Sequence, residues 1–136
     1  EMQRSLVGSE MCIRDRGYDD RSSIVEQFAI HTFFTHWDTL GLCGGVLRVD
    51  GTLVGFSIGE PLNRDTFVTH IEKADIAYQG SYTALTQAFT AQFAKDYRYI
   101  NREEDLGIAG LRQAKASYYP VYLLEKGDLV IPASMR

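Results

Sequence analysis

Cysteine and long apolar runs are both scarce in this 136-residue chain, which contains two cysteines. Because Cys12 lies in a segment that we expect to be foreign to the protein, Cys43 is left as a lone thiol. This excludes a disulfide framework and fits a reducing compartment, so we expect a cytoplasmic protein. No apolar run approaches the ~20 residues that a membrane-spanning helix needs, and no transmembrane segment is expected. The sequence also has no set of residues at the spacing typical of metal ligands, and we expect no metal.

Basic charge is not in excess. The chain has 14 lysine and arginine residues against 18 aspartate and glutamate residues, which gives a formal net charge of −4. This mild acidity argues against a protein that coats nucleic acid with its whole surface, although a local basic patch stays open. Internal repeats and low-complexity segments are missing too, and the length suits one domain with a real core.

The first residues differ in kind from the rest. Glu10–Arg16 back-translates to a sequence that resembles a transposon-end sequencing adapter. We therefore expect residues 1–16 to be non-native, and we expect the native protein to begin near Gly17 and to extend further upstream. The domain organisation that follows is a single lobe over residues 17–126 and a C-terminal tail over residues 127–136.

The first predicted element is a helix that ends at Gly41, because a glycine often terminates a helix. Ser23 and Glu26 have the spacing of a capping box at its start. An apolar stripe at helical spacing follows, and we expect its aromatic members to lie in the core. The stripe comprises Val25, Phe28, Ala29, Phe33, Trp37 and Leu40.

Three strands are predicted next, over residues 45–49, 53–58 and 66–74. The first two flank Asp50-Gly51, which is a strong signal for a hairpin turn. In the third strand, His70 and Glu72 are two residues apart, so a regular strand places them on one face. Lys73 then points to the opposite face.

Helices and strands alternate in the second half. A helix is predicted from Gly80-Ser81, with Tyr82, Leu85, Phe89 and Phe93 on one face. A short strand at 98–101 precedes a helix from 108 to about 118, which Asp105 or a neighbour caps, and a last strand is predicted at 121–125. The order α-β-β-β-α-β-α-β predicts an α/β (α+β) fold with a mixed sheet flanked by helices.

Two charged motifs give this order a more specific meaning. His70–Ala74 and Tyr99–Gly107, followed by Gly110–Arg112 and Ala114-Lys115, resemble the C-terminal lobe of the DUF2156 proteins. These are related to the C-terminal domain of phosphatidylglycerol lysyltransferases. The resemblance covers roughly residues 29–126 and implies a GCN5-related N-acetyltransferase (GNAT)-like acyltransferase fold.

The resemblance also implies partners and a reaction. Members of the family have two tandem GNAT-like lobes, so the N-terminal lobe of the same protein is expected as a partner and is missing from this sequence. Relatives use aminoacyl-tRNA as acyl donor, and the acceptor here is expected to be a small molecule or a lipid. Acetyl-CoA-dependent N-acetyl transfer is one alternative, and a non-catalytic structural lobe is another. Transfer from aminoacyl-tRNA would require no cofactor.

The turn before residue 81 decides between the donors. In acetyl-CoA enzymes of this fold, the resemblance implies a glycine-rich turn whose backbone N–H groups grip the pyrophosphate. Here Gly80 alone fits that pattern, since Ala77 and the bulky Tyr82 replace two of its positions. Gly80 is thus the cofactor-binding candidate, and a simple turn residue before a helix is the alternative.

Candidate catalytic residues come from the first motif and from the end of the last helix. Glu72 beside His70 suits a general base toward an amine or hydroxyl acceptor. The alternative is a satisfied polar pair, with Glu72 bonded to Arg102. Tyr118 occupies the place where many GNAT enzymes keep a tyrosine as general acid toward the leaving group, and a core or interface aromatic is the alternative.

Candidate substrate-binding residues are charged and belong to both motifs. Acidic residues near a helix start complement its dipole, but that does not account for three in a row beside an arginine. We expect an ion network that lines a cleft, in which a basic pair on one helix face contacts an anionic substrate or tRNA phosphate. Internal salt bridges are the alternative. The set comprises Lys73, Arg102, Glu103, Glu104, Asp105, Arg112 and Lys115.

Overall fold

The structure is a computed structural model that describes residues 20–127 and residue 130, and the expectations for residues 1–16 and for most of the 127–136 tail lie outside this part. It comprises two compact units, one up to Glu103 and one from Glu104 onward. The elements run α3 (Asp20–Thr35), α4 (Trp37–Leu40), β1 (Cys43–Val49), β2 (Thr52–Pro61), β3 (Thr66–Ala74), α5 (Ser81–Phe89), the π-helix η2 (Thr90–Ala94), β4 (Tyr99–Asn101) and α6 (Ala109–Ala116).

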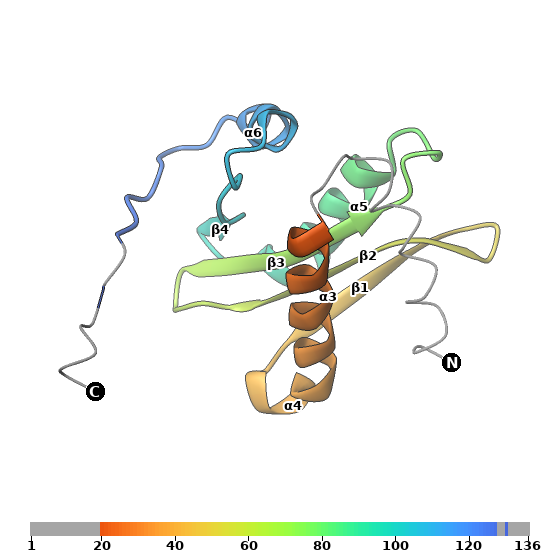
Figure 1. Ribbon diagram of the computed structural model, residues 1–136, viewed down its shortest axis with the longest axis horizontal. Coiled ribbons are helices and arrows are strands. Elements are labelled where there is room, and N and C mark those ends of the chain that lie inside the picture. The colour runs from red at the N-terminus through yellow and green to blue at the C-terminus, as the bar shows by residue number, and fades with distance from the viewer. Residues whose placement is uncertain (1–19, 128–129, 131–136) are drawn as a thin grey trace. The chain divides into compact units, whose positions relative to one another are not determined.

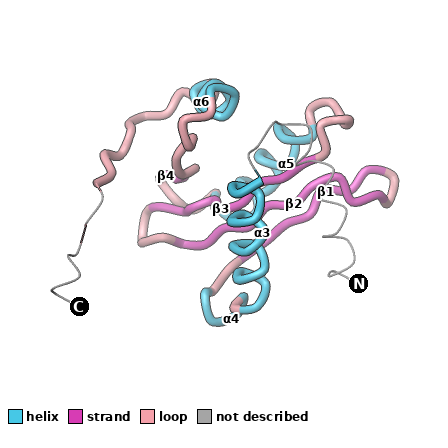
Figure 2. The backbone as a smooth tube through the Cα atoms, in the orientation of Figure 1, coloured by secondary structure: helices cyan, strands magenta, loops and turns pink. Residues whose placement is uncertain are grey.

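The first unit is built on a four-stranded sheet in the order β1-β2-β3-β4. The β1–β2 and β2–β3 pairs are antiparallel, whereas β3 and β4 are parallel. Helix α3 lies on one face of the sheet and α5 on the other (Figures 1 and 2). The expected α+β class, with a mixed sheet flanked by helices, is therefore confirmed. Among the described helices, none combines the length and apolar character needed to cross a bilayer.

The core on the α3 face is aromatic. Buried Leu42, Ile58 and Ile71 pack against partly buried residues of α3, α4 and β2, namely Ile30, Phe33, Phe34, Trp37 and Phe56. The Trp37 ring lies so close to β1 that a Cβ at Gly44 would be 2.6 Å from it, so only glycine fits there. The predicted core position of Phe28 is wrong, because that side chain is 73% exposed. The stripe that packs inward is instead the one through Phe33, Phe34 and Trp37.

The core on the α5 face packs the start of β3 against α5 and η2. Phe67 is buried against Phe89 and Ala94, with Phe93 and Tyr97 packed around them. The Phe67 and Phe89 rings meet edge to face, with centroids 5.9 Å apart. This geometry suits the quadrupoles of two aromatic rings. It confirms that Leu85, Phe89 and Phe93 share the inner side of this helix.

A β-bulge interrupts β3 at His70. Ile58 is paired with Ile71, and the next residue of β2, Gly59, is paired with Thr69, so His70 is the extra residue. A bulge places two successive side chains on one side of the strand and reverses the alternation beyond it. Gly59 is required opposite the bulge, because a Cβ there would lie 2.4 Å from the carbonyl oxygen of Val68.

Most predicted elements are present with small shifts of their ends. The turn at Asp50-Gly51 has positive φ at both residues (49° and 81°), as a two-residue hairpin turn requires. Gly41 ends α4 in the left-handed conformation, as expected. The capping box is wrong, because α3 begins at Asp20 and Ser23 lies inside it.

The second unit contains α6 and an extended segment. The predicted cap by Asp105 is wrong, because the N-cap residue is Ile108 and no side chain caps the helix. Residues 121–125 form no strand in the described part of the chain, contrary to the expectation. Their apolar side chains are exposed, including Val121 and Leu123. A strand needs a hydrogen-bonded neighbour, and this unit offers none within its described residues.

We predict that Gly59→Ala destabilises the protein by about 1–3 kcal/mol, because the new methyl group collides with backbone that cannot move without undoing the bulge. Denaturant unfolding measures the change. The matched control is Gly110→Ala, where nothing lies within 4 Å of the added Cβ and helix propensity favours alanine. Equal stability of the two variants would show that β3 is not bulged opposite Gly59.

Candidate functional site

Polar side chains gather where β3 and β4 part. Their pairing ends at Val68 and Asn101, while β3 continues to Ala74. The two residues that follow β4, Arg102 and Glu103, both turn back to side chains on β3. The candidate site of the first unit therefore lies along the second half of β3.

Glu72 is the centre of the cluster on the α5 face. Its Oε1 accepts a hydrogen bond from Arg102 Nη2 at 2.8 Å and another from Thr86 Oγ1 of α5 at 2.8 Å. The Glu72 side chain is 13% exposed and that of Arg102 is 24% exposed. Charge-assisted bonds of this kind are strong, so the carboxylate is held in one orientation. The expected contact between Glu72 and Arg102 is confirmed.

His70 is the centre of a second cluster, on the α3 face. Its Nε2 lies 2.9 Å from Glu60 Oε1 of β2, and its Nδ1 lies 2.7 Å from Glu103 Oε1. Its ring also packs against Phe33 of α3, with centroids 5.2 Å apart. The hydrogen bond to Glu103 raises the pKa of His70, and that to Glu60 adds to the effect, although partial burial opposes both.

The expectation that His70 and Glu72 share a face is wrong. The bulge at His70 turns that side chain toward α3, whereas Glu72 meets α5. Period-two alternation fails here because the bulge adds one residue between the two halves of the strand. With both ring nitrogens engaged by carboxylates, His70 matches the structural alternative and is not placed to assist Glu72 as a base.

Lys73 faces α3, as the bulge requires. Its Nζ lies 2.7 Å from Glu26 Oε1 of α3, and both side chains are partly buried. The ion pair joins the helix to the sheet. A substrate-binding role for Lys73 stays a prediction, and any substrate there would have to compete with Glu26.

The charged residues of the second unit pair with one another. Asp105 Oδ2 accepts from Arg112 Nε at 2.6 Å and its Oδ1 accepts from Arg112 Nη2 at 3.2 Å, a two-pronged contact. Arg112 and the Gly107 N–H hold the pKa of Asp105 at about 2. Lys115 Nζ donates to the carbonyl oxygen of Glu104 at 2.6 Å. The geometry matches internal pairing, and substrate or tRNA contacts of these residues stay predictions.

The turn before α5 uses its own backbone amides. Asp75 accepts from the N–H of Ala77 through its side chain and from that of Tyr78 through its carbonyl oxygen. Ser81 N–H donates to the Tyr78 carbonyl oxygen. Gly80 is the N-cap residue with a φ of 81°, so the turn needs glycine for its conformation alone. Its cofactor-binding role stays a prediction, as does catalysis by the half-exposed Tyr118 of the second unit.

Two residues of these clusters were not foreseen, Glu60 and Thr86. Glu60 lies beyond the expected end of β2, in a strand that otherwise reads as apolar. Thr86 is four residues after Tyr82, so helical spacing places it near the inner face of α5. A polar residue at such a position is a usable signal, because a buried hydroxyl needs a partner.

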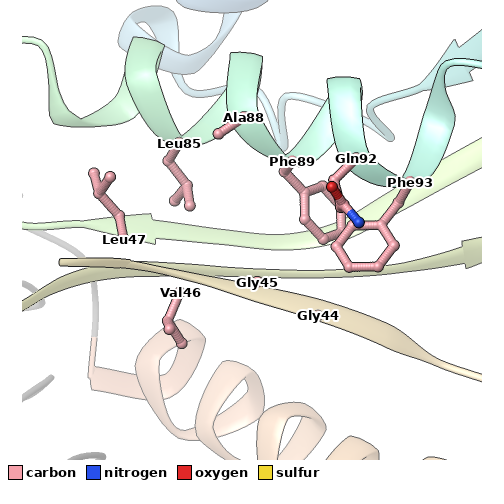
Figure 3. Close-up of a pocket in the computed structure, with 9 residues that line it drawn as sticks. All are labelled: Gly44, Gly45, Val46, Leu47, Leu85, Ala88, Phe89, Gln92 and Phe93. Atoms are coloured by element: carbon pink, nitrogen blue, oxygen red, sulfur yellow. The ribbon is translucent and has the colours of Figure 1, made fainter.

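A cavity of about 310 Å3 opens between β1 and α5. Gly44 and Gly45 form its floor, and Leu85, Phe89 and Phe93 project toward it from the helical side (Figure 3). Gly45, Ser57 and Glu72 are paired in one cross-strand row, so the cavity and Glu72 belong to the same face of the sheet. The lining is apolar apart from Gln92 and the backbone, and none of the sequence-predicted site residues lines it.

No group of three or more metal-binding side chains is arranged for a metal ion within residues 20–127.

Comparison with protein families gives one match over most of the chain. The family model described as phosphatidylglycerol lysyltransferase, C-terminal, matches residues 13–126. This confirms the resemblance that the two charged motifs indicated. A search of curated protein sequences finds no match.

Similar solved structures include the following two. A conserved protein of unknown function from Bacteroides thetaiotaomicron is 38% identical, with a TM-score of 0.74 over 90% of this chain. This chain spans about 40% of the length of that protein. A ribosomal-protein-alanine N-acetyltransferase from Brucella melitensis biovar Abortus is 18% identical, with a TM-score of 0.47, over 67% of this chain and 69% of that one. A likeness this weak carries no argument about fold or function.

We predict that Arg102→Gln lowers the free energy of unfolding by about 1–3 kcal/mol, because it removes the cation from a largely buried carboxylate. Chemical denaturation checks the value. The matched control is Arg48→Gln in β1, where the exposed guanidinium donates to the Gly51 carbonyl oxygen, and a change within about 0.5 kcal/mol is expected. If both variants lost the same small amount, Arg102 would not support Glu72.

Proposed function

We propose that this chain is a lobe of an acyltransferase. The premise is that the chain belongs to the family described as phosphatidylglycerol lysyltransferase, C-terminal. In this proposal an aminoacyl group moves from aminoacyl-tRNA to a small-molecule or lipid acceptor. The observation that carries the proposal is Glu72, a carboxylate fixed by Arg102 and Thr86 beside the end of a parallel strand pair.

Glu72 suits the role of general base. Both of its hydrogen bonds within the described residues are accepted by Oε1, which leaves Oε2 to meet an acceptor. In the reaction, the acceptor amine or hydroxyl loses its proton to Glu72 and attacks the ester carbonyl of the donor. A new C–N or C–O bond forms, the ester C–O bond breaks, and the tRNA hydroxyl leaves with a proton from a general acid.

Arg102 and Thr86 act in this scheme by positioning Glu72. They come from different elements, since Arg102 lies in the segment after β4 and Thr86 lies in helix α5. Both of these elements therefore hold the Glu72 side chain. A base restricted to one orientation loses less entropy when the acceptor arrives. The proposal therefore makes both residues necessary for full activity although neither takes the proton.

Aminoacyl-tRNA is favoured over acetyl-CoA by the turn before α5. A pyrophosphate site needs several backbone N–H groups aimed outward at the ligand. Here the N–H groups of Ala77, Tyr78 and Ser81 are engaged within the turn. This supports a donor that does not depend on a pyrophosphate cradle.

A second lobe belongs to the proposal as a partner. The relative from Bacteroides thetaiotaomicron is much longer than the part that this chain matches. We infer that an N-terminal GNAT-like lobe of the same protein supplies the remaining surface for tRNA and for the acceptor, in the cytoplasm. A non-catalytic role for the present lobe would leave Glu72 without effect on transfer, which makes this residue the discriminating position.

We predict that Glu72→Gln in the longer, two-lobe protein lowers the rate of lysyl transfer from lysyl-tRNA by about 10²–10⁴-fold. The acceptor in the assay is phosphatidylglycerol in vesicles, because the family description names it. Glu125→Gln, an exposed position in the extended segment, is the matched control and should retain the rate. Transfer at the native rate by Glu72→Gln would make this lobe non-catalytic.

We predict that the two-lobe protein binds aminoacyl-tRNA and gives no saturable heat with micromolar acetyl-CoA in calorimetry. Filter binding across a salt series should show a steep loss of tRNA affinity, since phosphate contacts release counterions. Lys115→Ala or Arg112→Ala should reduce the slope by about 1 if either contacts a phosphate. Tight acetyl-CoA binding that Gly80→Val abolishes would instead establish the acetyltransferase alternative.

A further inference from the structure

The arrangement around His70 depends on one proton. Its two ring nitrogens lie 2.9 Å from Glu60 Oε1 and 2.7 Å from Glu103 Oε1. A carboxylate only accepts, so each nitrogen has to donate, and a neutral imidazole has a single N–H. Both contacts are made together only by the imidazolium form. The neutral ring leaves one of the two glutamates facing an unprotonated nitrogen.

Glu103 belongs to a segment that side chains hold in place. It follows β4 with a φ of 55°, the left-handed region that non-glycine residues seldom adopt. Its N–H donates to Asn101 Oδ1 at 2.8 Å, which closes a small turn. Its carboxylate meets His70 on the α3 face, while Arg102 before it meets Glu72 on the α5 face. Arg102 and Glu103 thus contact β3 side chains on opposite faces of the sheet.

The other charges near His70 are already matched. On β3 itself, Lys73 is paired with Glu26 of α3 and Glu72 is paired with Arg102. On α3 the group that meets the ring is the apolar Phe33. At the start of β1, the Cys43 thiol is close enough to Glu60 for that carboxylate to raise the thiol pKa, after the larger effect of burial. Glu60 and Glu103 are therefore the charges in direct contact with the imidazole.

We propose that Glu60, His70 and Glu103 form a pH-sensitive clip, which fastens the segment after β4 to β2 and β3 while His70 is protonated and loosens it when the proton leaves. The inference rests on these contacts and stands apart from the acyl-transfer proposal. Its consequence for that proposal is direct, because Arg102 precedes Glu103 and orients Glu72.

The direction of the effect follows from the contacts. Hydrogen bonds to Glu103 and Glu60 raise the pKa of His70 above its usual value near 6.5. The folded protein therefore binds a proton more tightly than the unfolded chain does. The stabilisation is complete below about pH 6.5 and is lost as the pH rises through the raised folded pKa. Above that pH, two carboxylates face a neutral ring and the left-handed turn at Glu103 loses its tether.

NMR on the chain tests the clip without any assay of activity. The His70 ring signals should titrate with a midpoint above 6.5. Over the same pH range, the protection factor of the Glu103 amide, corrected for its intrinsic exchange rate, should fall by at least about tenfold, as expected for loss of a hydrogen bond to a charged group. A His70 midpoint at or below 6.5, or constant protection at Glu103, would overturn the proposal.

Two glutamine variants separate a clip from a purely structural contact. Glu103→Gln should lower the His70 midpoint and make the Glu103 amide insensitive to pH, and Glu60→Gln should lower the midpoint by a smaller amount. Both positions are partly exposed, so the variants should keep the native thermal unfolding curve at pH 8. His31→Gln, an exposed histidine on α3, is the control and should change neither readout. Unchanged His70 titration in Glu103→Gln would contradict the clip.

Discussion

The β-bulge at His70 is the constraint on which the rest of the first unit depends. It exists because Gly59 has no side chain where the carbonyl oxygen of Val68 approaches. The extra residue reverses the alternation of side chains within β3, so that His70 and Ile71 both face α3 and Glu72 faces α5. Without it, the two ionisable residues of this motif would share one environment and interact with each other.

The reversal explains why the segment after β4 is so densely charged. Arg102 and Glu103 leave a short strand that pairs only with the first half of β3, and each returns to a partner of opposite charge on a different face. The carboxylate at 72 needs a cation, and the imidazole at 70 needs a carboxylate. Separating the faces keeps these pairs from exchanging partners. Both hydrogen bonds that Glu72 accepts from the described residues go to the same oxygen, Oε1.

Much of this fold follows from local sequence signals. The hairpin at Asp50-Gly51, the helix end at Gly41 and the full span of β3 depend on turn chemistry and alternation, which act over a few residues. The contact of Glu72 with Arg102 could be predicted too, because a charged residue directly after β4 can reach an unlike charge on the neighbouring strand β3. The family was recognisable from the same charged motifs.

The other features of the fold and site depend on contacts between elements, which local sequence patterns do not specify. Glycine at 59 signals a bulge only once its partner strand is known. The α3 stripe through Phe28 and the stripe through Phe34 fit a helix equally well, and packing on the sheet selects the second. The apolar segment at 121–125 has the composition of a strand but no partner among the described residues of its unit. Thr86 and Glu60 become site residues only through contacts across elements.

The most direct measurement of the central claim is a set of nuclear Overhauser contacts from β3 in solution. The account predicts contacts from the His70 ring to the Phe33 ring and from the Glu72 side chain to the Thr86 methyl group. The His70 ring should show no contact to Thr86, and the Glu72 side chain should show none to the Phe33 ring. Contacts from both His70 and Glu72 to α5 would mean that the strand alternates regularly, and would contradict the assignment of Glu72 and His70 to separate roles.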